Sequence, residues 1–195
     1  MRFHPGQSID FNLRAGRAHT PPRPPLQPII QGQQRGGALA RDWPPQGFAV
    51  HRAENTDDPD RLRQIVEALD RIAATVWPVH PRTRKRIGEM GWAASVVTTI
   101  DPLSYLDMLL LEGHARFILT DSGGVQKEAY FFCVPCITLR DETEWQETLE
   151  NQCNVLTGCS QQPILEAASA VSKTGPWSKS YGDGRAADKI LDALA

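Results

Sequence analysis

The sequence has few of the features that mark membrane or nucleic-acid-binding proteins. No apolar run approaches the roughly 18 residues that a membrane span requires, and the start, MRFHPGQSID, lacks the basic-then-apolar order of a secretory signal. Neither charge dominates, because the net charge is -2 and the pI is about 6.2. Such a chain has no basic field to attract nucleic acid or anionic lipid. We therefore expect a cytoplasmic protein that binds neither membrane nor nucleic acid.

Cysteine is also scarce, with four residues at Cys133, Cys136, Cys153 and Cys159. A chain of this length does not need a disulfide scaffold, so we expect reduced thiols. The Cys133-x-x-Cys136 spacing suggests a redox or zinc motif, but a thioredoxin-type pair begins a helix, whereas this pair is expected to end a helix and begin a strand. No second pair has zinc-ligand spacing. We therefore expect buried core cysteines and no metal site.

Proline is unevenly distributed. The first 46 residues hold eight of the fifteen prolines and carry a local charge of +4, from six arginines and two acids. The run TPPRPPLQP at 20–28 cannot form a helix or a central strand, because proline lacks the amide donor and fixes φ. We interpret residues 1–46 as an irregular Pro/Arg-rich segment, a linker or disordered arm, with an interaction segment as the alternative. Residues 47–195 then form one domain.

From Gly47 onward, short apolar runs alternate with segments of helical period. This alternation predicts a Rossmann-like α/β fold, a parallel sheet with helices on both faces. Strands are expected at 48–50, 75–79, 95–100, 116–119, 135–139 and 154–156. Helices are expected from Pro59 after an Asp58 N-cap, from Pro81, from Pro102, and at 124–132, 162–172 and 185–194.

Polar segments follow these strands, at the sheet edge where parallel α/β folds bind ligands. Ser122-Gly123-Gly124 would let backbone amides approach a diphosphate at the positive end of a helix. Glu128 lies one turn further on the same face, where its carboxylate could accept hydrogen bonds from a ribose diol. Together these residues suggest a nucleotide. The alternative for Ser-Gly-Gly alone is a glycine-rich turn without a ligand.

Three other polar segments are candidates for the same edge. His51 could be a general base or a phosphate donor, and Arg52 would add permanent charge. His80 could donate to a phosphate. For both histidines the alternative is an imidazole hydrogen-bonded to backbone. Arg140 and Glu144 could clamp a substrate, but dense charge at a strand exit is more often a solvated salt-bridge network.

Six segments, in order, resemble the second domain of the bacterial non-hydrolysing UDP-N-acetylglucosamine 2-epimerases. They are VHRAENTDDPDRL from Val50, PVHPRTRKRI from Pro78, DPLSYLDMLLL from Asp101, TDSGGVQKEAY from Thr120, PCITLRDETEWQETLE from Pro135 and YGDGRAADKI from Tyr181. The resemblance implies one half of a glycosyltransferase-B-like fold, with residues 1–46 as a remnant of the first domain. It implies that UDP is held by Ser122, Gly123, Gly124 and Glu128. His51 matches the family's functional histidine, and Arg52, Glu54, His80, Arg140 and Glu144 fall in its other ligand-side motifs.

The resemblance also implies an activity. The family interconverts UDP-N-acetylglucosamine and UDP-N-acetylmannosamine by eliminating and re-adding UDP, without a cofactor, in cell-surface polysaccharide synthesis. Its first-domain acidic segments are not recognisable here, so we expect the chain alone to be incomplete or inactive, with a partner chain or homo-oligomer supplying the other half. The alternatives are a non-catalytic UDP-sugar-binding or regulatory module and, less favoured, a glycosyltransferase. An exposed apolar face including Ile190 and Leu191 on the final helix would fit packing against that other half.

Overall fold

The structure is a computed structural model that describes residues 46–49, 52–171, 177–178 and 180–194. The chain divides into two compact units, residues 24–178 and residues 1–23 with 179–195, which are treated separately below. The Pro-rich arm expected over residues 1–46 lies outside the described residues, apart from Gln46. None of the described helices is long and apolar enough to cross a membrane.

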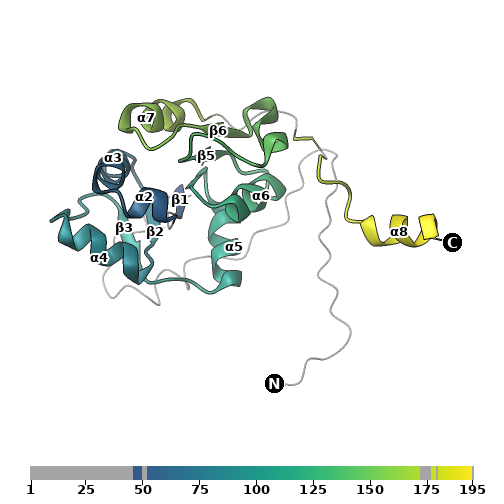
Figure 1. The fold of residues 1–195 in the computed structure, drawn as a ribbon, viewed down its shortest axis with the longest axis horizontal. Helices are drawn as coiled ribbons and strands as arrows, with labels where there is room; N and C mark the ends of the chain where they lie inside the picture. Colours follow the sequence, from purple (N-terminus) through teal and green to yellow (C-terminus); the bar gives the residue numbers. More distant parts are fainter. Residues whose placement is uncertain (1–45, 50–51, 172–176, 179, 195) are drawn as a thin grey trace, which may run out of the picture. The chain divides into compact units, whose positions relative to one another are not determined.

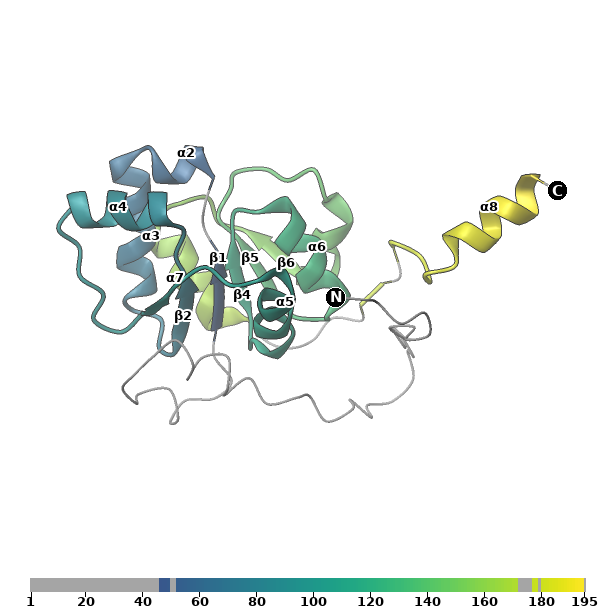
Figure 2. The same ribbon diagram turned by 90° about the horizontal axis from the view of Figure 1, so that it is seen from below.

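The larger unit is built on a six-stranded, wholly parallel sheet (Figures 1 and 2). Its strands are β1 (Gln46–Ala49), β2 (Thr75–Pro78), β3 (Thr98–Ile100), β4 (Ile118–Thr120), β5 (Cys136–Thr138) and β6 (Asn154–Leu156). Their order in the sheet is β3-β2-β1-β4-β5-β6. The chain therefore builds outward from β1 in one direction, returns to pair β4 with β1, and continues in the other direction. The switch point of the topology lies between β1 and β4, where sheets of this kind bind ligands.

Helices connect successive strands, as the alternation of the sequence predicts. They are α2 (Ala53–Thr56), α3 (Pro59–Leu69), α4 (Pro81–Glu89), α5 (Tyr105–His114), α6 (Gly123–Phe131) and α7 (Gln161–Ala170), with a 3₁₀ helix, η1, over Gln146–Gln152. The expected Rossmann-like fold is confirmed. The short α2 and η1 were not expected, because four to seven residues are too few to establish a helical period.

The core has two sides because successive strand residues point to opposite faces of the sheet. Trp77, Leu119 and Ile137 lie fully buried on the face that packs against α3 and α7. Ile118 and Cys136, each one position away from these, pack on the opposite face against α6. This arrangement explains why the strands read as continuous apolar runs rather than as alternating ones.

Helix starts follow the capping residues. Asp58 caps α3 as expected, since its Oδ1 accepts hydrogen bonds from the amides of Asp60 and Arg61 at 2.9 and 3.1 Å. The start expected at Pro102 is wrong. The helix α5 begins at Tyr105, because the Oγ of Ser104 caps it by accepting from the Asp107 amide at 3.3 Å.

One cysteine departs from its expected burial. Cys136 is buried, and burial raises the pKa of its thiol to about 12. Cys133, also expected in the core, is exposed. It adopts φ +53° at the end of α6, where the Val134 amide bonds back to the Ala129 carbonyl at 2.9 Å. The buried residues Ala129 and Tyr130 precede this left-handed residue and the buried Val134 follows it, whereas Cys133, at the turn itself, lies at the surface.

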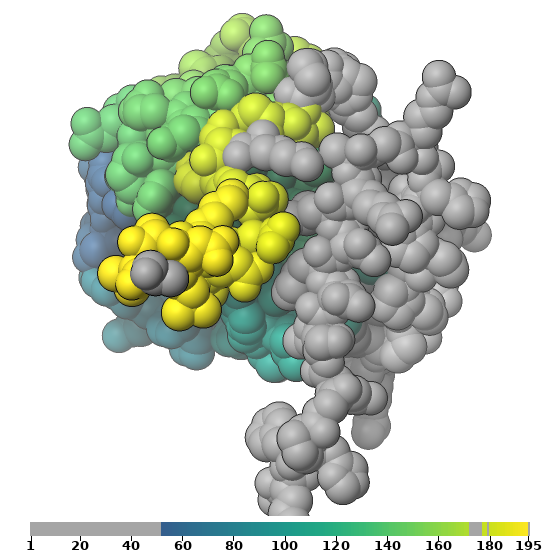
Figure 3. All heavy atoms as spheres, turned by 90° about the vertical axis from the view of Figure 1, so that its right-hand side faces the viewer, coloured from purple at the N-terminus to yellow at the C-terminus, as the bar shows by residue number. Residues whose placement is uncertain are grey.

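The described part of the smaller unit contains α8 (Ala186–Leu194), drawn in yellow in Figure 3. The helix is amphipathic, and its side chains of Ile190, Leu191 and Leu194 are 59, 66 and 80% exposed. The exposed apolar face expected for this helix is present.

Candidate functional site

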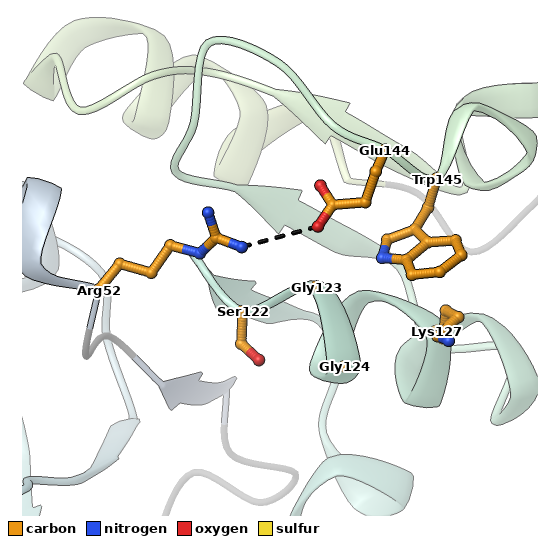
Figure 4. A pocket seen from close by; sticks show the side chains of 7 residues that line it. All are labelled: Arg52, Ser122, Gly123, Gly124, Lys127, Glu144 and Trp145. Atoms are coloured by element: carbon orange, nitrogen blue, oxygen red, sulfur yellow. Dashed lines mark ion pairs between the residues drawn. The ribbon is translucent and has the colours of Figure 1, made fainter.

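A pocket of about 410 Å³ opens at the carboxyl ends of β1 and β4. Figure 4 shows the residues that line it, which come from three segments of the chain: the segment after β1, the start of α6 and the loop after β5. The lining residues are Arg52, Ser122, Gly123, Gly124, Lys127, Glu144 and Trp145. The pocket therefore lies at the topological switch point, and it brings together five residues that the sequence singled out: Arg52, the Ser-Gly-Gly segment and Glu144.

The floor of the pocket is the N-terminus of α6. Ser122 is the N-cap of this helix, and its Oγ accepts from the Val125 amide at 3.5 Å. The first amides of a helix have no partner within the helix, and the aligned peptide dipoles make this end positive. Side-chain-free Gly123 and Gly124 leave these amides open to a ligand. The floor is suited to an anion of phosphate size.

Glu144 lies across this positive helix end. Its carboxylate meets Arg140 Nη1 at 2.7 Å and Arg52 Nη2 at 3.6 Å, and Figure 4 shows Arg52 and Glu144 pointing toward each other above Ser122. Hydrogen bonds from its own backbone amide and from Arg140 lower the pKa of Glu144. A phosphate on the floor would therefore compete with the Glu144 carboxylate for the Arg52 guanidinium.

The far wall is formed by Lys127 and Trp145, which sequence reasoning did not identify. The Lys127 ammonium lies 3.9 Å from the centre of the Trp145 ring, a cation–π contact that joins α6 to the loop after β5. The sequence does not reveal this pair, because the two residues lie on different elements. The contact adds a second cation to a pocket that already holds Arg52.

The position of Arg52 depends on a buried carboxylate. Asp121, fully buried at the end of β4, accepts at Oδ2 from the Arg52 amide and from Asn55 Nδ2, each at 3.1 Å. The Asn55 amide group also donates to the Leu139 carbonyl at 3.0 Å. These bonds tie the loop after β1 to β4 and β5. Sequence reasoning left Asp121 and Asn55 without a role.

A buried polar network fixes the other side of the pocket. Gln126 Oε1 on α6 accepts from Thr143 Oγ1 at 2.7 Å and from Asn154 Nδ2 at 3.3 Å. Asn154 also accepts from Thr138 Oγ1 at 2.7 Å and donates to Thr148 Oγ1 at 3.0 Å. Hydrogen bonds between fully buried groups hold one geometry well. This network keeps the segment that carries Glu144 and Trp145 in place over α6.

Glu128 lies on α6 but outside the lining of the pocket. It is half-buried and faces α5, where hydrogen bonding to Glu128 raises the pKa of Tyr105. Glu112, also on α5, is 1% exposed. Burial, followed by the charge of Glu128, raises the pKa of Glu112 to about 9. Sequence reasoning did not identify Glu112, because its burial depends on how α5 packs on α6.

Two further candidates, Glu54 and His80, do not line the pocket. Glu54 is exposed and pairs with Arg61 at 3.4 Å. His80 is the exposed N-cap of α4, and its Nδ1 accepts from the Arg82 amide at 3.3 Å. His51, the catalytic candidate, lies outside the described residues. No group of three metal-ligating side chains occurs within the described ranges.

Gly123 is packed more tightly than its neighbour Gly124. A Cβ at Gly123 would come within 2.9 Å of both Glu144 Oε1 and Trp145 Nε1, whereas at Gly124 the nearest atom, Ser122 Oγ, is 3.7 Å away. We expect Gly123→Ala to lower the free energy of unfolding by about 1–2 kcal/mol relative to Gly124→Ala, since alanine forces the loop off the helix only at the first position. Urea denaturation of both variants measures this difference, and equal stabilities would contradict it.

Comparisons of the sequence with known proteins find relatives that are described as 2-epimerases of UDP-sugars. The sequence profile of the family described as UDP-N-acetylglucosamine 2-epimerase matches residues 38–195. UDP-2,3-diacetamido-2,3-dideoxy-D-glucuronate 2-epimerase of Pseudomonas aeruginosa is 48% identical over 174 residues, which are 86% of this chain and 47% of that protein. UDP-N-acetylglucosamine 2-epimerase of Methanocaldococcus jannaschii is 40% identical over 158 residues, 75% of this chain and 43% of that protein.

Solved structures give the same relationship. The structure of UDP-GlcNAc 2-epimerase from Methanocaldococcus jannaschii matches with a TM-score of 0.73 and 34% identity, over 87% of this chain and 48% of that one. A structure of that enzyme in complex with UDP-GlcNAc and UDP matches with a TM-score of 0.67 and 37% identity, over 77% and 44% of the two chains. The chain spans about half the length of the relatives it matches.

Proposed function

Because this chain belongs to the UDP-N-acetylglucosamine 2-epimerase family, we propose that residues 47–195 are the domain that binds the UDP part of a UDP-N-acetylhexosamine. The observation that carries this proposal is the placement of Arg52 beside the open, positive end of α6 at the switch point of the sheet. A diphosphate is the part of a nucleotide sugar that such an end binds best.

Each candidate residue has a proposed role. Ser122, Gly123 and Gly124 would donate backbone and hydroxyl hydrogen bonds to the phosphates, and Arg52 would exchange Glu144 for a phosphate oxygen. Glu128 would accept from the ribose diol. Of the others, His51 would act at the sugar as the family's functional histidine, and His80 would donate to a phosphate. Glu54, Arg140 and Glu144 would make further contacts with the UDP-sugar. The fit of cations and helix end to a dianionic group supports the first part of this assignment.

The reaction we propose for the whole protein is the interconversion of UDP-N-acetylglucosamine and UDP-N-acetylmannosamine, by elimination and re-addition of UDP, without a cofactor. A proton must leave and return at sugar C2 while UDP departs from C1, which requires acid and base groups on both faces of the sugar. We propose that the groups this chain does not supply come from a partner chain or a second copy. We place the activity in the cytoplasm, in cell-surface polysaccharide synthesis.

Calorimetry with UDP tests the binding proposal. We expect the parent chain to bind UDP and the double variant Ser122→Ala, Glu128→Ala to bind it at least tenfold more weakly, because one phosphate contact and the ribose acceptor are lost. The double variant Ser169→Ala, Glu166→Ala is the matched control, since both residues are exposed on α7. Absence of UDP binding by the parent chain would contradict the proposal.

Incubation with UDP-N-acetylglucosamine tests the reaction separately. We expect no manno epimer from this chain alone, because several of the acid and base groups would come from elsewhere. Binding of UDP without turnover under every condition, including mixtures with the first half of a family member, would favour a non-catalytic UDP-sugar-binding module instead.

A further inference from the structure

Glu112 carries a buried carboxyl group that does not line the pocket and has no role in the function proposed above. It is 1% exposed, and neither carboxyl oxygen accepts a hydrogen bond from a donor in the described residues. Burying a carboxyl group in such a place costs free energy unless the group is neutral or has a hydrogen-bond or charge partner. Its position relative to Glu128 suggests what that partner is.

Glu112 and Glu128 belong to two helices, α5 and α6, that contact each other near both residues. Glu112 directly precedes Gly113, where a Cβ would meet the Phe132 ring at 3.6 Å. The Phe132 amide in turn donates to the Glu128 carbonyl one helical turn back, at 3.0 Å. Tyr105 lies seven residues before Glu112, on the same face of α5. Glu112 and Tyr105 both interact with Glu128, and they do so from one face of α5.

Within the described part of the chain, three titratable groups interact with Glu112. They are Glu128 on α6, Tyr105 in the first turn of α5, and Cys136 on β5, whose thiol is also affected by Glu112. None of the three is a cation that could balance a charge on Glu112. When two carboxyl groups share such a site, one of them keeps its proton. The more buried one, Glu112, is that acid, and it can donate its single proton to the Glu128 carboxylate.

We infer that Glu112 is a positioning residue, which in its protonated form donates a hydrogen bond to Glu128 and so orients that carboxylate toward the ribose of UDP. One Glu128 oxygen is then occupied by the Glu112 donor, and the other is left to accept from the diol. Loss of the Glu112 proton would place two negative charges side by side and turn Glu128 away. The inference rests on the proposed binding of ribose by Glu128.

UDP calorimetry at pH 7 and pH 10 tests the inference with the parent chain, Glu112→Gln and Glu112→Leu. Glutamine keeps a donor and cannot ionise, whereas leucine removes the donor. At pH 7 we expect Glu112→Gln to bind UDP within about twofold of the parent and Glu112→Leu to bind it about tenfold more weakly. Between pH 7 and pH 10 we expect the parent to lose about tenfold more affinity than Glu112→Gln. Because the uracil ring and other titrating groups affect both chains equally, the ratio of the two affinities isolates Glu112.

The ligand 2′,3′-dideoxy-UDP supplies the control for ribose. Because this ligand lacks the diol, the three chains should have the same affinity for it as one another at pH 7, and again at pH 10. Circular dichroism at each pH checks that the chains remain folded. If UDP binds but the parent and Glu112→Gln weaken in parallel with pH, the inference is overturned and the proposed function stands. If the parent does not bind UDP at any pH, the proposed function fails and the inference fails with it.

Discussion

At pH 7, Glu112→Gln is expected to raise the free energy of unfolding by about 3 kcal/mol. The pKa of Glu112 is raised from its ordinary value of 4.5 to about 9, chiefly by burial. The unfolded chain thus releases this proton near pH 4.5 and the folded chain near pH 9. Between these values the folded state holds more protons, so the stability of the parent falls as the pH rises. Glutamine has no proton to release at this position, so the stability of the Glu112→Gln variant lacks this dependence on pH.

Urea denaturation from pH 5 to pH 9 measures the effect. The stability difference between variant and parent should widen by about 1.4 kcal/mol per pH unit across this window and level off above it. The control is Glu67→Gln, which makes the same substitution at an exposed position of α3. Its curve should run parallel to that of the parent. Parallel curves for Glu112→Gln and the parent would show that Glu112 is ionised in the folded protein.

Asp121→Ala is expected to lower the free energy of unfolding by about 3 kcal/mol and to weaken UDP binding as well. Asp121 is fully buried, and its removal leaves the Arg52 amide and the Asn55 side chain without the oxygen that both donate to. Buried donors that lose their acceptor account for the loss of stability. Arg52, no longer held at the end of β4, accounts for the loss of binding.

Asp141→Ala is the matched control for Asp121→Ala. The Asp141 side chain is 75% exposed, and its nearest cation, Arg61, is 3.8 Å away. An exposed pair of this kind contributes little, so the stability should change by less than about 0.5 kcal/mol. Thermal or urea unfolding of the two variants, followed by UDP calorimetry, makes the comparison. Equal effects at the two positions would contradict the role given to Asp121.

The local features of the fold could be predicted because they depend on neighbouring residues. Asp58 and Pro59 encode the start of α3 through capping and a fixed φ, and the apolar run 135–139 encodes β5. The start of α5 was misplaced because both Pro102 and Ser104 are helix-start signals, and Ser104 makes the capping bond. Cys133 was misplaced because the left-handed residue that ends α6 is not marked by a glycine.

The candidate site was predicted in part for the same reason. Ser122, Gly123 and Gly124 form a local motif, and parallel topology carries Arg52 to the same edge of the sheet. The pair of Lys127 and Trp145 was not predictable, since nothing in either segment indicates that a lysine on α6 lies under a ring from the loop after β5.

By itself, the sequence determined the alternation of strands and helices, the glycine-rich helix start and the family to which the chain belongs. Each of these depends on short-range periodicity, capping or ordered motifs, which a linear chain displays directly. Only the tertiary structure decided which charges are buried and which partners they have. Asp121 is held by donors from the loop after β1, and Glu112 faces another carboxylate across two packed helices. Burial and charge pairing depend on contacts between distant segments, and a carboxyl group acquires its protonation state only when those segments meet.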